Sequence, residues 1–194
     1  MDAPTDARMD APINAPAKND ARVLAEPVTD RDHALGPAAA PVTIVEYGDY
    51  ECPDCLNFVP VIARVRQRLG DRLRFVFRHF PRSNIHPRAS AAAEAAEAAG
   101  DQGKFWEMHE ALFRHQAELS EIDFSHLALK LGLEIYQFES SRSRELHSRR
   151  VRNDYDSGVR SGVSKTPTLF INGRRYEGRV EADAIAAAAE AALG

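Results

Sequence analysis

The sequence contains very little cysteine: only Cys52 and Cys55 carry a thiol among its 194 residues. A small secreted domain stapled by disulfides usually has more cysteines, spread along the chain, so this class is excluded. Two cysteines separated by two residues indicate either redox chemistry or half of a metal site. A pair of inert core cysteines would rarely have this spacing.

Long apolar runs and a strong charge of either sign are also missing. No stretch approaches the roughly 18 to 20 apolar residues that cross a bilayer. The net charge of -4 gives no reason to expect binding to nucleic acid or to an anionic membrane. The N-terminus also lacks the basic and then apolar segments of a secretory signal. We therefore expect a cytoplasmic protein with no nucleic-acid or membrane partner; a missing leader would instead make it periplasmic or extracytoplasmic.

Residues 1–33 offer little that could form a core. Asp, Ala and Pro are frequent in them, and the tetrapeptide Met-Asp-Ala-Pro occurs twice. Such a segment cannot offset its ordering entropy by burial, so we expect a disordered tail. Residues 34–194 have the length and apolar content of one globular domain.

The first part of this domain has the pattern of a β-α-β unit. Residues 41–47 are apolar and β-branched, as in a buried strand. Apolar residues within 58–69 recur every three or four positions, as on a helix with one apolar face. Residues 73–80 alternate and predict a second strand. Two strands joined by a helix in this way run parallel.

The rest of the chain predicts helices followed by a hairpin. Residues from about 83 to 160 are helical in pattern. A strand at 168–171, the turn dipeptide Asn172-Gly173, a return strand at 174–177 and an Ala-rich helix at 180–193 follow. The predicted fold class is therefore α/β: a four-stranded mixed sheet, βαβ and then ββα, with an all-helical insertion at about 83–160.

The motif Cys52-Pro53-Asp54-Cys55 lies where the first strand meets its helix. Residues three apart on one helical turn can approach to the distance that a disulfide needs. The helix N-terminus favours a thiolate at Cys52, and a thiolate is the attacking species in disulfide exchange. Cys55, one turn further on, is placed to resolve a mixed disulfide. Pro53 suits the first helical turn.

A structural zinc site is the alternative that the two cysteines leave open. His79 and His86 could be proposed as further ligands. Zinc normally takes four ligands, and the sequence has no second CxxC pair and no closely spaced histidines. We therefore expect no metal, and no cofactor either, because the cysteines themselves carry the redox equivalents.

Four motifs make the chain similar to the DsbA-like family of thiol-disulfide oxidoreductases. They are GDYECPDC at 48–55, FRHFP at 77–81, KFWEMH at 104–109 and GVSKTPTLFING at 162–173. The resemblance covers about residues 34–194. It implies a thioredoxin fold with a helical insertion, and a protein-disulfide oxidoreductase activity.

The resemblance also implies roles for residues outside the cysteine motif. In the family, the proline of the Thr-Pro-Thr loop is cis and packs beside the cysteines; this position is Pro167. Thr166 would then offer its backbone to an extended substrate chain, as in strand addition. Glu46, on the strand beneath the site, would accept the proton of Cys55 as a general base.

Asp54 departs from strongly oxidising members of the family, which often have His at this position. A negative charge beside the cysteines should disfavour the thiolate, which stabilises the disulfide and lowers the reduction potential. We therefore predict a weak oxidant on the reducing or isomerising side. Changing Asp54 to His should raise the potential by tens of millivolts.

The predicted function is disulfide exchange with protein thiols and disulfides as substrates. A thioredoxin-like protein or a glutathione system would serve as redox partner. A glutathione-dependent transferase or isomerase that uses a single thiol is one alternative, against which Cys55 argues. A holdase chaperone that grips unfolded chains with its helical block is the other.

Overall fold

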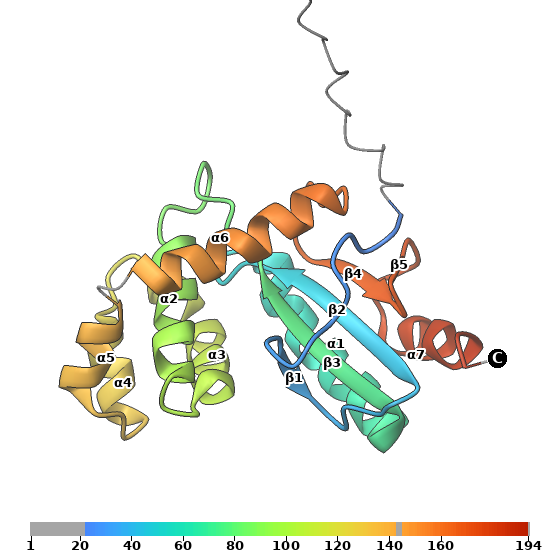
Figure 1. Ribbon diagram of the computed structural model, residues 1–194, viewed down its shortest axis with the longest axis horizontal. Coiled ribbons are helices and arrows are strands. Elements are labelled where there is room, and N and C mark those ends of the chain that lie inside the picture. Colours follow the sequence, from blue (N-terminus) through green and yellow to red (C-terminus); the bar gives the residue numbers. More distant parts are fainter. Residues whose placement is uncertain (1–21, 143–144, 194) are drawn as a thin grey trace, which may run out of the picture.

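A five-stranded mixed sheet forms the centre of the computed structural model, which describes residues 22–142 and 145–193 (Figure 1). The strand order is β1-β3-β2-β4-β5. Strands β2 and β3 are parallel, and the other neighbours are antiparallel. The strands are β1 (His33–Leu35), β2 (Val42–Gly48), β3 (Leu73–His79), β4 (Thr168–Ile171) and β5 (Arg174–Arg175). The sheet thus has one strand more than the four predicted, because β1 pairs with the edge of β3.

Residues 22–33, which lie before the boundary predicted at residue 34, contact the sheet. The N–H of Leu24 donates to the carbonyl of Gly173, and the N–H of Arg175 donates to the carbonyl of Arg22, both at 2.8 Å. The Asp32 carboxylate accepts from the buried guanidinium of Arg78 at 2.8 Å. A buried arginine needs such a partner, and composition alone did not reveal it. The part of the predicted tail before residue 22 lies outside the described residues.

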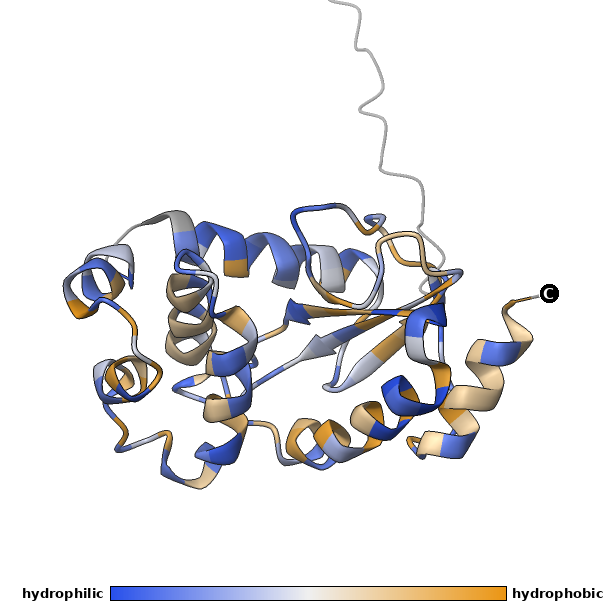
Figure 2. Ribbon diagram, turned by 90° about the horizontal axis from the view of Figure 1, so that it is seen from below, coloured by the Kyte–Doolittle hydropathy of each residue, from blue (hydrophilic) through white to orange (hydrophobic). Residues whose placement is uncertain are grey.

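Helices α1 (Pro53–Leu69) and α7 (Ala182–Ala191) cover one face of the sheet (Figures 1 and 2). The buried side chains of α1, including Phe58 and Ile62, pack against Val42 and Ile44 of β2. Side chains alternate along a strand, so Glu46 points to the same face as Val42 and Ile44. This places a carboxyl group beneath the helix that carries the cysteines.

Helix α6 (Glu145–Arg160) covers the opposite face (Figure 2). It approaches closely at Gly158, where an added Cβ would lie 2.6 Å from the Phe80 ring and 3.0 Å from that of Tyr47. Part of the predicted helical insertion is described as two helices, α5 (Ile135–Arg142) and α6; residues 143–144 between them lie outside the described residues.

The helical insertion is built around α2 (Ala89–Gly100), most of whose alanines are fully buried. Small side chains allow α3 (Phe105–Arg114), α5 and α6 to pack closely against it. Helix α4 (Phe124–Lys130) completes the insertion. Both cysteines belong to the same apolar cluster as these helices, so the insertion forms one wall of the cysteine site. Within the described ranges, no helix combines the length and the apolar character needed to span a bilayer.

Candidate active site

Both cysteines lie at the N-terminus of α1. Cys52 is the N-cap residue, with extended backbone angles of φ -77° and ψ 119°. Its carbonyl accepts from the N–H groups of Cys55 at 3.1 Å and Leu56 at 3.2 Å. Pro53 occupies the first turn, as its fixed φ allows. Cys52 is 5% exposed and Cys55 is 0% exposed, so only Cys52 is open to an incoming sulfur.

The loop that precedes β4 lies against Cys52. The peptide bond between Thr166 and Pro167 is cis. The Cys52 thiol donates to the carbonyl oxygen of Thr166 at 3.2 Å. A pocket of about 270 Å³ borders this contact and is lined by Asp54, Asn57, Phe58, Lys165, Thr166, Pro167 and Val180. The structure therefore brings the loop and the cysteine motif together around one cavity.

The thiol of Cys52 has a pKa lowered to about 5. The largest cause is a hydrogen bond from Cys55; burial acts in the opposite direction. The Thr166 side chain and the backbone amides of Cys55 and Asp54 lower the pKa further. Amides at a helix N-terminus stabilise negative charge in this way. At neutral pH, Cys52 is consequently a thiolate.

The pKa values of Glu46 and Cys55 are raised, in contrast to the lowered pKa of Cys52. Burial, and then the charge of Cys52, raise the pKa of Glu46 to about 8. The Oε1 atom of Glu46 is buried and has no hydrogen-bond partner among the residues described. Burial, the hydrogen bond to Cys52 and the charge of Glu46 raise the pKa of Cys55 well above its usual value. The carboxyl group and the resolving thiol therefore hold their protons more tightly than usual.

Asp54 enters the site through its backbone. Its amide lowers the pKa of Cys52, whereas its exposed carboxylate is not among the causes of that shift. The prediction of a less stable thiolate assumed that this carboxylate acts on Cys52. The pKa of Cys52 is lowered all the same, and residue 54 contributes to this through its amide, which the sequence motif does not reveal.

Asp49 is a buried residue of the site that sequence reasoning missed. Its carboxylate accepts from the N–H groups of Glu51 and Arg82 and from Nδ1 of His86, each at 2.8 Å. The Asp49 carbonyl accepts from the N–H of Cys52 at 3.1 Å, and its amide lies at the sulfur of Cys55. The available signal was an acidic residue directly after an apolar strand and just before the cysteine pair.

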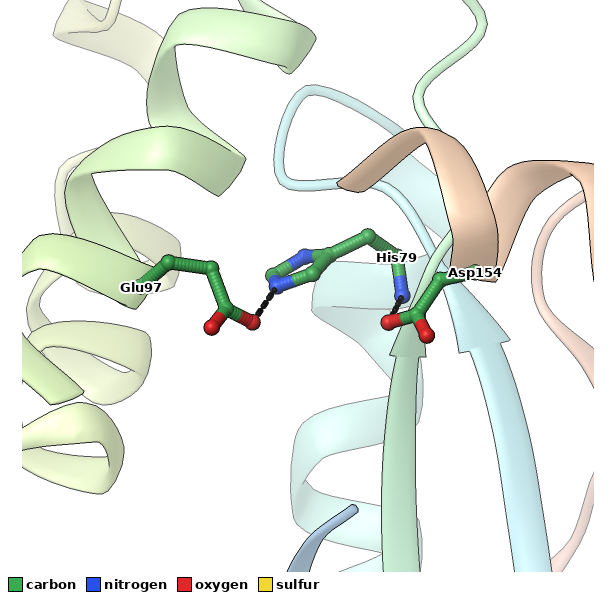
Figure 3. Close-up of side chains that lie close together, drawn as sticks. All are labelled: His79, Glu97 and Asp154. Carbon is green, nitrogen blue, oxygen red and sulfur yellow. Dashed lines mark hydrogen bonds and ion pairs between the residues drawn. The ribbon is translucent and has the colours of Figure 1, made fainter. Parts of the chain in front are cut away.

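One group of side chains in the described part of the chain has metal-ligand chemistry. Ligand atoms of His79, Glu97 and Asp154, all buried, lie within 4.8 Å of one another (Figure 3). The Nε of Arg150 lies 3.7 Å from Glu97 Oε1 and 3.9 Å from Asp154 Oδ1, so a permanent cation already faces both carboxylates. His33 and His79 each bond to Glu97 Oε1 at 2.9 Å. These contacts make the group a hydrogen-bonded ion network that ties β1, β3, α2 and α6 together.

The two histidines considered for a zinc site are engaged elsewhere. His79 bonds to Glu97, and His86 bonds to Asp49. Neither of the groupings that contain them includes a cysteine sulfur. The geometry therefore supports redox chemistry at Cys52 and Cys55 rather than their use as metal ligands.

Comparison with known proteins gives the same picture. A family model described as thioredoxin matches residues 28–191. A Na(+)/H(+) antiporter NhaA 1 from Salinispora arenicola is 47% identical over 166 residues, which cover 84% of this chain and 25% of that protein. The chain thus spans about a quarter of the length of the curated relatives it matches.

Solved structures resemble the chain over most of its length. BdbD from Bacillus subtilis superposes with a TM-score of 0.76 at 25% identity, covering 89% of this chain and 98% of that one. DsbA2 from Pseudomonas aeruginosa gives 0.71 at 26% identity, with 87% and 97% covered. The chain belongs to the thioredoxin family, and its structure is that of a DsbA-like member of it.

Proposed function

We propose that the chain exchanges disulfides with protein substrates, with Cys52 as the attacking or attacked sulfur and Cys55 as the resolving one. The observation that carries this proposal is the contrast between the two thiols. Cys52 has a pKa of about 5 and contacts Thr166, which lines a pocket, whereas Cys55 is fully buried with a raised pKa. Such a pair forms a mixed disulfide at one sulfur and resolves it with the other.

In the oxidising direction, a substrate thiolate attacks the sulfur of Cys52 in the Cys52–Cys55 disulfide. The S–S bond breaks, Cys55 leaves with the electron pair, and Glu46 supplies its proton. A second substrate thiolate then attacks the substrate sulfur of the mixed disulfide. Cys52 leaves as a thiolate, stable because of its low pKa. Two substrate thiols become one disulfide, and the enzyme ends as a dithiol.

The cis-proline loop would hold the substrate chain. When Cys52 is protonated, the Thr166 carbonyl accepts from its thiol. When Cys52 is deprotonated or bonded to a substrate sulfur, this donor is gone and the carbonyl is available to a substrate N–H. Pro167 and the pocket of about 270 Å³ beside it would take the neighbouring side chain of the substrate.

The direction of exchange follows from the stability of the Cys52 thiolate. A stable thiolate favours the dithiol and makes the disulfide more oxidising. Thioredoxin has a thiol pKa of about 7 at roughly -270 mV, and DsbA one of about 3.5 at roughly -120 mV. The pKa of about 5 for Cys52 falls between them. We therefore propose a potential of roughly -180 mV, in the isomerising range and above the reducing range.

The test is to equilibrate the protein in glutathione buffers and count alkylated thiols by mass spectrometry. A potential of about -160 to -210 mV supports the proposal, and a value near -270 mV refutes it in favour of the original Asp54 argument. Glutathione turnover that survives in Cys55→Ser would favour the single-thiol alternative. Client protection that survives in the Cys52→Ala/Cys55→Ala double variant would favour the holdase.

The compartment and the redox partner stay predictions. A cytoplasmic location was expected from the sequence, with a periplasmic or extracytoplasmic one if a leader is missing. A thioredoxin-like protein or glutathione remains the expected source of redox equivalents. A potential in the isomerising range would favour an oxidising compartment, because cytosolic dithiols are kept reduced.

A further inference from the structure

A glutamine of the helical insertion donates hydrogen bonds directly to the backbone of the cysteine motif. Gln116 begins the short 3-10 turn Gln116–Glu118 after α3. Its Nε2 donates to the carbonyl of Tyr50 at 2.8 Å and to the carbonyl of Cys52 at 3.0 Å. A side-chain amide has two N–H donors, so each carbonyl receives one of them.

The Cys52 carbonyl is the first hydrogen-bond acceptor of α1. It also accepts from the N–H groups of Cys55 and Leu56, which close the first helical turn. Within the described ranges, Gln116 is the donor that reaches this carbonyl from outside α1. Its position therefore bears on how the Cys52 peptide is oriented and on the charge distribution at the helix N-terminus.

Other contacts between the insertion and this loop hold side chains. The Tyr50 hydroxyl bonds to Nδ1 of His109 at 3.1 Å, and the Glu51 carboxylate accepts from the N–H of Arg88 at 2.6 Å. These contacts fix where the loop lies against the insertion. They do not bond to the peptide group that follows Cys52, so the orientation of this peptide depends on backbone contacts and on Gln116.

We propose that Gln116 is a positioning residue through which the helical insertion sets the redox balance of the cysteine pair. It holds the Cys52 peptide in the orientation that starts α1, and it places the positive end of an N–H dipole on the carbonyl of the exchanging cysteine. Both effects favour the dithiol. This inference rests on the proposed role of Cys52 as the exchanging sulfur.

The chain offers a matched control in Gln102. This residue is also half-buried and also bridges two segments, since its Nε2 donates to the carbonyl of Glu134 at 3.2 Å and its Oε1 accepts from the N–H of Glu134 at 2.9 Å. These bonds lie within the insertion and do not involve the cysteine motif. Gln116→Ala and Gln102→Ala therefore remove the same kind of contact at two different places.

The experiment measures the thiol-disulfide equilibrium constant against glutathione and the pH midpoint of Cys52 alkylation in both variants. Gln116→Ala should shift the equilibrium about 3- to 10-fold towards the disulfide, which lowers the potential by about 14 to 30 mV. Its alkylation midpoint should rise. Gln102→Ala should match the wild type in both measurements. Gln116→Glu keeps the shape but replaces donors with acceptors, so it should shift both quantities further in the same direction.

Melting temperatures of the oxidised and reduced forms separate a positioning role from a structural one. If Gln116→Ala loses stability equally in both forms and keeps the wild-type equilibrium constant, the inference is overturned. A wild-type protein that forms no Cys52–Cys55 disulfide in glutathione buffers would instead contradict the proposed function. The two failures therefore give different results.

Discussion

Replacing Glu46 by Gln tests the proton transfer on which the proposed exchange depends. The substitution keeps the size of the side chain and removes its titratable proton. The pKa of Glu46 is raised from 4.5 to about 8, first by burial and then by the charge of Cys52. Two consequences follow, one for stability and one for rate, and they can be measured on the same variant.

The stability effect has a defined sign. Between pH 4.5 and about 8 the folded protein keeps the Glu46 proton that the unfolded chain has lost. Stability therefore falls as the pH rises through this window, by up to about 1.4 kcal/mol per pH unit. Glu46→Gln should match the wild type near pH 4.5 and exceed it by several kcal/mol at pH 8. Urea unfolding at a series of pH values gives the difference.

The rate effect concerns the resolving step. The pKa of Cys55 is well above its usual value, so the free thiol is a poor nucleophile at neutral pH without a base. Removing a general base typically costs about 10² in rate or more. A mixed disulfide formed between Cys52 and a cysteine peptide should therefore release the peptide about 10²-fold more slowly in Glu46→Gln. Quenched-flow alkylation at pH 7 follows this release.

The pH profile supplies the refuting result. In the wild type the release rate should rise through an apparent pKa at or slightly below 8, because the mixed disulfide lacks the Cys52 charge that helps to raise the pKa of Glu46. Glu46→Gln should lack this inflection. Glu94→Gln is the control, since burial also raises the pKa of Glu94, which lies on α2, and neither cysteine is among the causes of that shift. Equal rates and profiles in Glu46→Gln and wild type would refute the general-base role.

Three further predictions test the surroundings of Cys52 and the packing of α6. Asp54→Asn should change the reduction potential by less than about 10 mV, because residue 54 favours the thiolate through its backbone amide, which the variant keeps; a change of tens of millivolts in glutathione buffers would support a charge effect of the carboxylate. Thr166→Val should raise the pH midpoint of Cys52 alkylation by roughly one unit, since it removes a buried hydroxyl that has no other partner among the described residues and favours the thiolate; an unchanged midpoint would contradict this. Gly158→Ala should lower the free energy of unfolding by about 1 to 3 kcal/mol, because its Cβ would lie 2.6 Å from the Phe80 ring; wild-type stability in urea would show that α6 can shift at no cost.

Much of the fold could be predicted from periodicity and turn residues. The strand at 41–47, the helix after Pro53 and the strand at 73–80 all lie where the pattern put them. The Asn172-Gly173 turn has positive φ at both residues, as its dipeptide indicates. Strand β1 was not predicted, because a strand of three residues is too short to show an alternating pattern. Its partner residues in β3 also lie about forty positions later in the sequence.

Most residues of the site could be predicted from the sequence, but their effects on the pKa values of the cysteines could be predicted only in part. Cys52, Cys55, Thr166, Pro167 and Glu46 gather around one helix N-terminus, which motif spacing and the family resemblance could indicate. The sequence could not predict how an N–H group or a carboxylate is oriented relative to a cysteine sulfur, because this orientation depends on side-chain rotamers and loop geometry. That is why the sequence assigned a charge effect to Asp54 that the structure gives to its amide.

The two thiols differ in pKa because they contact different parts of the fold. Cys52 receives donors from the start of α1 and from the loop at Thr166, all of which favour its anion. Cys55 lies one turn deeper, in the apolar cluster of the insertion and above the carboxyl of Glu46, and both surroundings disfavour its anion. The loss of the Cys55 proton is therefore the costly step of exchange. The pKa of Glu46 is about 8 and falls in the mixed disulfide, where the Cys52 charge is absent, so that this carboxyl can accept the proton near neutral pH. A lower pKa at Glu46 would make it a weaker base, and a higher one would leave it protonated, so the burial of this carboxyl beneath α1 is part of the proposed catalysis.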